Sequence, residues 1–141
     1  MRPNVLFILA DDMGAWAMGC VGNPEIRTPH LDALAARGIR FANFFCASPV
    51  CSPARASILT GRIPSAHGVH DWLARGNTDH PGLENWNGAK PHPPVQYLDG
   101  MTAYTDVLAG AGYRCDLDGK WHLGASPTAE SLPALKSLDR W

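Results

Sequence analysis

Two apolar segments in the first third of the chain predict β-strands with a helix between them. Residues 4–10 form a continuous β-branched and aliphatic run, typical of a strand covered on both faces in a parallel sheet. Residues 39–45 begin with alternating apolar positions and are rich in aromatic side chains, which favours a second strand. Between them, Thr28 can cap a helix that begins at Pro29 and stops at Gly38. The order strand, helix, strand is typical of a βαβ unit.

The alternation of helices and strands resumes further along the chain. Pro53 predicts a short helix that Gly61 ends. A further helix is expected to begin at Thr102 and to end at Gly110 or Gly112. The whole pattern predicts an α/β fold in which a mostly parallel sheet is flanked by helices on both faces.

The rest of the chain gives weaker signals. Residues 113–117 predict a short strand after that helix. Residues 71–101 are expected to form an irregular, variable loop, because prolines and glycines concentrate in this part of the chain. The tail, residues 125–141, has only a weak helical pattern around Leu132, Leu135 and Leu138.

The composition argues against several classes of partner and location. The formal net charge is −1 and 18% of the 141 residues are charged, so neither a nucleic acid nor a membrane surface is expected as a partner. The first apolar run is too short for a membrane span and lacks the cleavage site of a signal peptide, which predicts a cytoplasmic protein. The four cysteines form no CxxC pair and are expected to be reduced thiols.

Two adjacent carboxylates, Asp11 and Asp12, follow the first predicted strand. Open α/β sheets bind their ligands at the carboxyl ends of the strands. Adjacent carboxylates repel each other unless donors or a cation neutralise them, and Ca²⁺ or Mg²⁺ prefers such clustered oxygens. A loop in which the two side chains cap backbone N–H groups is the more frequent explanation of an isolated Asp-Asp pair.

A thiol and a guanidinium lie close together around the predicted helix that contains Pro53. Cys51 is expected just ahead of the helix N-terminus, and Arg55 follows four residues on. Helix N-terminal N–H groups and a guanidinium both favour negative charge nearby, which indicates a nucleophile or an anion-binding site. A buried structural cysteine beside a surface arginine fits these residues equally well.

A lysine and a histidine lie two residues apart in the glycine-bounded segment 119–124. An extended backbone would point Lys120 and His122 to the same side. A lysine can hold an anionic oxygen and a histidine can move a proton near neutral pH, so the pair suits transfer of a charged group. A solvated lysine beside a hydrogen-bonded histidine is an equally frequent arrangement. The other histidines have no ligand partner at a suitable spacing, and His67 and His70 are expected to belong to loop structure.

Taken together, these motifs resemble the formylglycine-dependent sulfatases of the alkaline phosphatase superfamily. That family carries a Cys-x-Pro-x-Arg core extended by Leu-Thr-Gly-Arg, which is matched here by Cys51, Pro53, Arg55 and residues 59–62. The segments 3–12, 28–32 and 119–124 match further family motifs in the expected order. The resemblance covers roughly residues 3–124.

The resemblance implies a fold, a reaction and a set of site residues. The fold would be alkaline-phosphatase-like. A formylglycine-generating or radical maturation enzyme would oxidise Cys51 to formylglycine, whose hydrated form attacks an aryl or carbohydrate sulfate ester. Asp11, Asp12 and the oxygen at position 51 would bind a divalent metal, Ca²⁺ in preference to Mg²⁺. Arg55 would hold the diol. Lys120 would bind sulfate oxygens, and His122 would orient or deprotonate the diol.

The resemblance also implies that residues 1–141 are the N-terminal part of a sulfatase catalytic domain. Sulfatases that resemble this chain are several times longer and add a later Asp-Asn metal pair, a second histidine and another lysine. Because Ca²⁺ usually takes about six to eight oxygens, the isolated chain is expected to be inactive. Two alternatives are a phosphonate monoester or phosphodiester hydrolase with the same modified cysteine, and a non-catalytic truncated remnant.

Two acidic residues depart from a buried strand pattern. Asp116 and Asp118 lie on or beside the strand predicted over residues 113–117. Since Asp118 adjoins the Lys120 segment, it either pairs with a cation there or weakens anion binding.

Overall fold

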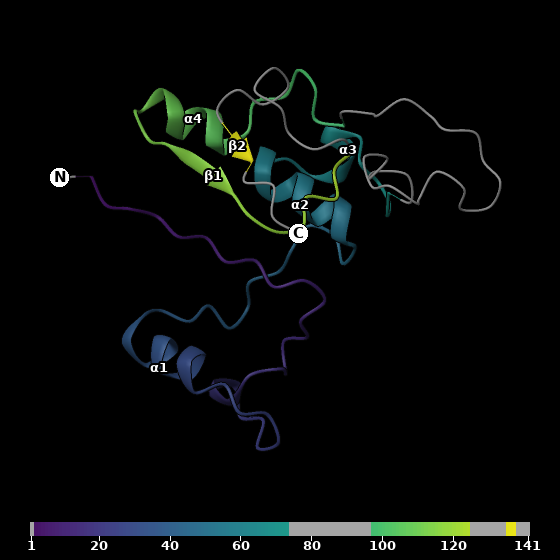
Figure 1. Cartoon of the computed structure of the whole chain (residues 1–141). Coiled ribbons are helices and arrows are strands. Elements are labelled where there is room, and N and C mark those ends of the chain that lie inside the picture. Colours follow the sequence, from purple (N-terminus) through teal and green to yellow (C-terminus); the bar gives the residue numbers. More distant parts are fainter. Residues whose placement is uncertain (1, 74–96, 125–134, 138–141) are drawn as a thin grey trace, which may run out of the picture. The chain divides into compact units, whose positions relative to one another are not determined.

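The computed structural model describes residues 2–73, 97–124 and 135–137 and divides the chain into two compact units, Met1–Phe45 and Cys46–Trp141 (Figure 1). The buried hydrophobic side chains among the described residues all belong to the second unit, which therefore carries the core. None of the helices in these ranges has the length and apolar character needed to cross a lipid bilayer.

The N-terminal unit contains one α-helix, α1 (Pro29–Arg37), and a single 3-10 turn, η1 (Gly19–Val21). α1 begins at Pro29 and is followed by Gly38, which confirms the helix predicted here. Proline suits the first helical position because its fixed φ is already helical and its missing N–H would find no partner inside the helix.

A small hydrogen-bond network ties η1 to the start of α1. The Thr28 hydroxyl donates to Asp32 Oδ1 (2.9 Å) and accepts from the Gly19 N–H (2.8 Å). The same Asp32 oxygen accepts from the Cys20 N–H (2.7 Å). A Cβ on Gly19 would lie only 2.6 Å from Asp32 Oδ2, so a larger residue there would force this carboxylate to shift. Thr28 occupies the N-cap position of α1 as predicted, but its hydroxyl links two segments and makes no capping hydrogen bond.

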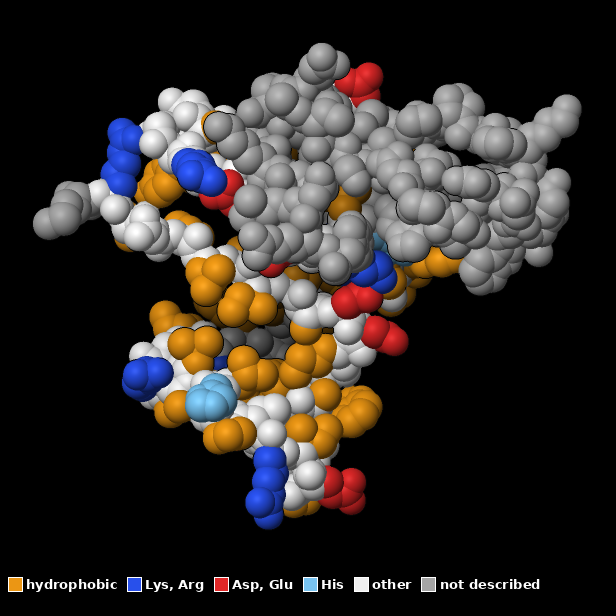
Figure 2. All heavy atoms as spheres, viewed as in Figure 1, with side chains coloured by type: hydrophobic (Ala, Val, Ile, Leu, Met, Phe, Trp, Pro, Cys, Tyr) orange, Lys and Arg blue, Asp and Glu red, His pale blue; other side chains and the backbone are white. Residues whose placement is uncertain are grey.

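The strands predicted over residues 4–10 and 39–45 are absent from the structure, and both segments are irregular. Their apolar side chains are exposed, with Leu6 84%, Ile39 83% and Phe44 84% accessible. Figure 2 shows such hydrophobic side chains on the surface of the part that carries α1. The prediction failed because an apolar run indicates burial, while a strand forms only where a neighbouring strand pairs with its N–H and C=O groups. No described strand pairs with either segment.

The described residues of the C-terminal unit form three helices: α2 (Cys51–Thr60), α3 (Pro64–His67) and α4 (Tyr104–Gly110). α2 begins two residues before the predicted Pro53 and ends where the sequence predicts. Gly61 adopts a left-handed φ of 66° there and donates its N–H to the Ser57 carbonyl (2.8 Å).

A two-stranded parallel sheet lies beside α4 (Figure 1). β1 (Cys115–Leu117) pairs with β2 (Leu135–Ser137), and Cys115 is opposite Leu135. β1 confirms the strand predicted over residues 113–117. The tail, for which the sequence shows only a weak helical pattern and no assigned structure, contributes the strand β2, because pairing with an adjacent strand outweighs a leucine spacing of three. In the described part, the expected parallel sheet is present as this pair alone.

Two of the predicted segments lie largely outside the described residues. Of the loop expected over residues 71–101, the described residues 71–73 and 97–101 are neither helix nor strand. The rest of that loop, and all of the tail except β2, are outside the described part.

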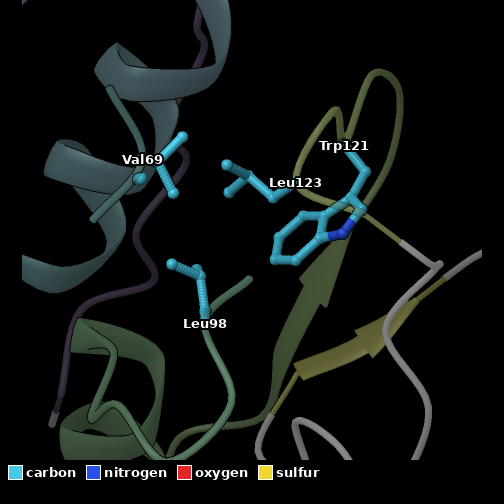
Figure 3. Packing of buried hydrophobic residues seen from close by; sticks show 5 residues of the cluster. Val69, Leu98, Trp121 and Leu123 are labelled. Atoms are coloured by element: carbon cyan, nitrogen blue, oxygen red, sulfur yellow. The ribbon is translucent and has the colours of Figure 1, made fainter. Parts of the chain in front are cut away.

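The core of the C-terminal unit packs α2 against the segment that contains Lys120 and His122. Val69, Leu98, Trp121 and Leu123 are at most 5% accessible and point toward one another (Figure 3). Ala56 of α2 completes this cluster. Trp121 and Leu123 lie on either side of His122, and burial of these two side chains stabilises the backbone around it by several kcal/mol. The core therefore fixes the segment on which two of the candidate site residues lie.

Candidate active site

Cys51 occupies the first position of α2, a helix of ten residues. The helix is preceded by Val50 in an extended conformation, with no side chain capping the first N–H groups. These N–H groups place partial positive charge around the start of α2, where a negatively charged atom would be stabilised. Cys51 is half-buried, and all four cysteines carry free thiols, as the sequence predicts.

Arg55 connects α2 to the segment that contains Lys120. Its Nη1 donates a hydrogen bond of 2.6 Å to the Lys120 carbonyl oxygen, across 65 positions of the sequence. Hydrogen bonds with a charged donor are about twice as strong as neutral ones. Arg55 and Lys120 are both half-buried, so this bond is partly shielded from water. The two motifs singled out in the sequence therefore meet in one unit.

His122 is held by its neighbours on several sides. The residue is 8% accessible, and its Nε2 lies 3.2 Å from the Leu73 carbonyl oxygen. The ring of Trp72 meets it edge to face, with 5.6 Å between centroids and an interplanar angle of 78°. Both Trp121 and Leu123 are buried, so the backbone on either side of His122 cannot move independently of the core.

Sequence reasoning missed three residues that support this region. Ser52 is fully buried, and its Oγ accepts a hydrogen bond of 3.3 Å from the Leu73 N–H. Trp72 and Leu73 contact His122 as described above. Ser52 could have been noticed because it lies inside the Cys-x-Pro-x-Arg core. Nothing in the composition around Trp72 and Leu73 indicates their part, because it depends on tertiary contacts.

The predicted metal ligands Asp11 and Asp12 belong to the N-terminal unit. Both are exposed, and they form a bend in the chain. Their expected approach to Cys51, which belongs to the other unit, stays a prediction. Across residues 2–73, 97–124 and 135–137, no three His, Cys, Asp or Glu side chains are grouped so that they could hold a metal ion.

Asp12 and His122 share an unusual backbone conformation. Among the described residues they alone, apart from glycines, have positive φ, at 58° and 57°. A left-handed residue with a side chain costs about 1 kcal/mol, and such strain concentrates at functional sites. Two residues chosen from the sequence for their chemistry are thus also the two with strained backbones, which favours both as site residues.

A second histidine, His67, is buried in a fixed tautomer. The Val69 N–H donates to its Nδ1 (3.1 Å), so Nε2 carries the proton and donates to the Ser57 hydroxyl (2.9 Å). With this tautomer the ring cannot act as a base toward Ser57. His67 ends the helix α3 and is 2% accessible, so it has a structural role in the unit, where the sequence suggested loop structure.

The two acidic residues that precede Lys120 in the sequence, Asp116 and Asp118, lie at the surface. Asp116 pairs with Arg114, with 3.1 Å between Arg114 Nε and Asp116 Oδ2, on an exposed part of β1. Asp118 is exposed as well. An exposed pair of this kind contributes little to stability.

A groove of about 360 Å³ lies away from these residues, between the end of α2 and the start of α4. It is lined by residues 58–62, 102–104 and 107. Tyr104 lies at this groove, where burial, followed by the nearby Cys115, raises the pKa of its phenol. None of the predicted site residues lines it, so it is not part of the candidate site.

A cysteine at a helix start, an arginine one turn on and a lysine-histidine segment bound to that arginine together suit a hydrolase acting on an anionic ester. Comparison with known proteins specifies the family. The Sulfatase family model matches residues 3–135. The chain belongs to the sulfatase family.

Individual relatives agree with this assignment. The chain is 38% identical to human arylsulfatase A over 139 residues and 37% identical to pig N-acetylgalactosamine-6-sulfatase over 143 residues, in each case across 99% of this chain. These matches cover 24% and 25% of the two relatives, so the chain spans about a quarter of their length.

A solved structure supports the fold. The crystal structure of yidJ from Bacteroides fragilis, a protein named as a sulfatase, matches with a TM-score of 0.57 and 36% sequence identity. The match covers 77% of this chain and 21% of yidJ. It indicates the alkaline-phosphatase-like fold implied by the sequence motifs, although the described part carries only one pair of strands.

We expect Arg55→Ala to lower the free energy of unfolding by roughly 2 kcal/mol, because it removes a charge-assisted bond and leaves a carbonyl oxygen without its donor. Urea unfolding followed by tryptophan fluorescence measures this loss. Arg62→Ala is the matched control, since Arg62 is exposed just beyond α2 and should change the value by less than about 0.5 kcal/mol. An equal loss in the two variants would contradict the role given to Arg55.

We expect His67 to make stability depend on pH. Burial first, and then the nearby His70, lower the pKa of His67 below its ordinary value of 6.5, against an opposing backbone hydrogen bond. The unfolded state therefore binds the proton more readily. The contribution of His67 is complete above about pH 6.5 and is lost as the pH falls through the folded-state pKa.

Urea unfolding of the wild type and His67→Gln between pH 8 and pH 5 measures this dependence. The variant should lose less stability on acidification than the wild type. His30→Gln, which removes an exposed histidine of α1, is the control and should follow the wild type. Parallel pH curves for wild type and His67→Gln would refute this account.

Proposed function

We propose that this chain is the N-terminal part of the catalytic domain of a sulfuric ester hydrolase, with a formylglycine made from Cys51 as nucleophile. Family membership supports the reaction class. The observation that carries the site is the bond from Arg55 Nη1 to the Lys120 carbonyl, since it joins the Cys51 helix to the Lys120 and His122 segment.

In the proposed reaction, the hydrated aldehyde at position 51 supplies both oxygens that are needed. One hydroxyl loses its proton and attacks the sulfur of the ester, and the alcohol leaves with a proton. The second hydroxyl then gives its proton to His122, the bond between carbon and the sulfated oxygen breaks, and sulfate departs as the aldehyde forms again. No water molecule has to attack the sulfur.

The cationic side chains have separate tasks in this proposal. Arg55, one turn along α2 from Cys51, holds the diol and offsets negative charge around it. Lys120 acts as a point charge for the sulfate oxygens. The N-terminal N–H groups of α2 add to the same positive field. Together they favour an anionic substrate over a neutral ester.

We also assign Asp11 and Asp12 as ligands of a divalent metal, together with the oxygen at position 51. Two adjacent carboxylates fit a hard cation. Ca²⁺ is preferred over Mg²⁺ because it accepts a larger number of oxygen ligands and tolerates a less regular arrangement of them. When bound, the cation would stabilise negative charge on the transferring group. Two carboxylates and the oxygen at position 51 do not complete a Ca²⁺ shell of about six to eight oxygens, so further ligands are required.

We expect Cys51 to be converted to formylglycine when the chain is produced together with a formylglycine-generating enzyme, because maturation acts on a short segment around the cysteine. Peptide mass spectrometry should show an aldehyde in place of the thiol at position 51. Cys46 is an internal control, since it lacks the Cys-x-Pro-x-Arg pattern and should keep its thiol. A thiol alone at position 51 would count against the proposal.

The purified 141-residue chain should hydrolyse 4-nitrophenyl sulfate poorly or not at all, even with formylglycine and Ca²⁺, because its metal ligands are incomplete. Release of nitrophenol by the chain and by Cys51→Ala is to be compared. We expect equal background rates. Turnover that disappears in Cys51→Ala would show that the chain is already an active sulfatase, contrary to this expectation.

A further inference from the structure

The backbone of Leu73 links the neighbour of the nucleophile to His122. Its N–H donates to Ser52 Oγ at 3.3 Å, and its carbonyl oxygen lies 3.2 Å from His122 Nε2. Ser52 is fully buried and directly follows Cys51 in the first turn of α2. The backbone of Leu73 is therefore bonded both to the first turn of α2 and to His122.

The bond to Leu73 fixes which nitrogen of His122 carries the proton. A carbonyl oxygen only accepts hydrogen bonds, so Nε2 must be the donor, and in the neutral ring the lone pair then belongs to Nδ1. The edge-to-face contact with Trp72 restricts rotation of the same ring. The left-handed backbone at His122, with φ at 57°, is retained because the residues on both sides are buried.

The serine in turn sets the position of the Leu73 peptide. Ser52 Oγ is enclosed within the unit, where a backbone N–H without an acceptor would cost about 1–3 kcal/mol. Loss of this hydroxyl therefore leaves the Leu73 N–H without its acceptor and weakens the hold on the carbonyl that faces His122.

We propose that Ser52 and the Leu73 peptide are a positioning device that holds His122 in the Nε2–H tautomer. Nδ1 is then the atom that receives the proton of the diol at position 51. The second statement rests on the proposed function, whereas the tautomer and its dependence on Ser52 do not. Ser52 and Leu73 position the histidine and do not themselves react.

The tautomer can be read directly in the 141-residue chain labelled with ¹⁵N-histidine. Long-range ¹H–¹⁵N correlation at pH 8 should give His122 the pattern of a ring protonated at Nε2, with the signal assigned by its loss in His122→Gln. The Nδ1–H pattern in the wild type would overturn the proposal. This measurement needs neither formylglycine nor substrate, so its failure is distinct from a failure to modify Cys51.

Substitutions of the serine test the positioning step. In Ser52→Ala, we expect the His122 signals to move toward the average of the two tautomers and the Leu73 amide to exchange with solvent about fivefold faster. Ser52→Thr keeps the hydroxyl and should restore both. Ser65→Ala removes an exposed serine of α3 and should change neither. If Ser52→Ala matches Ser65→Ala, the serine does not position His122. The His67 signals report whether each variant is folded.

Discussion

The burial of Trp121 and Leu123 against Val69 and α2 is the constraint on which the candidate site depends. These side chains lie on both sides of His122, so packing them against Ala56 brings the histidine and Lys120 to the helix that starts at Cys51. The hydrogen bond from Arg55 to the Lys120 carbonyl then selects one arrangement among those that the apolar contacts permit. Hydrophobic burial supplies most of the stability here, and the directional hydrogen bond fixes how α2 is aligned with the segment that contains Lys120.

Local signals in the sequence were sufficient for α1, α2, α4 and β1, whereas the short helix α3 was not predicted. Pro29 marks the start of α1 and Gly61 the end of α2, because the backbone preferences of proline and glycine act within one turn. β2 could not be predicted, since its pairing with β1 joins segments 20 positions apart in register. In segments 4–10 and 39–45, by contrast, strands were predicted that the structure does not contain. Their composition indicates strands, and strand formation requires a pairing partner that the described residues do not supply.

The candidate site was predictable to a similar extent. Cys51, Arg55, Lys120 and His122 stand out in the sequence because their functional groups carry or accept charge, and the structure brings the Arg55 guanidinium to Lys120. The supporting contacts of Ser52, Trp72 and Leu73 arise only when distant segments pack together. The expected approach of Asp11 and Asp12 to Cys51 would join two different units, and it stays a prediction.

The link through Leu73 uses only the N–H and the carbonyl of its main chain. Its side chain is replaceable as far as these bonds are concerned, and proline is the exception because it lacks the N–H. The link between Ser52 and His122 can therefore be kept when residue 73 is replaced by another residue that has a backbone N–H. A contact made by the main chain alone does not constrain the side chain at its position, so a family signature built from residue identities would not detect it.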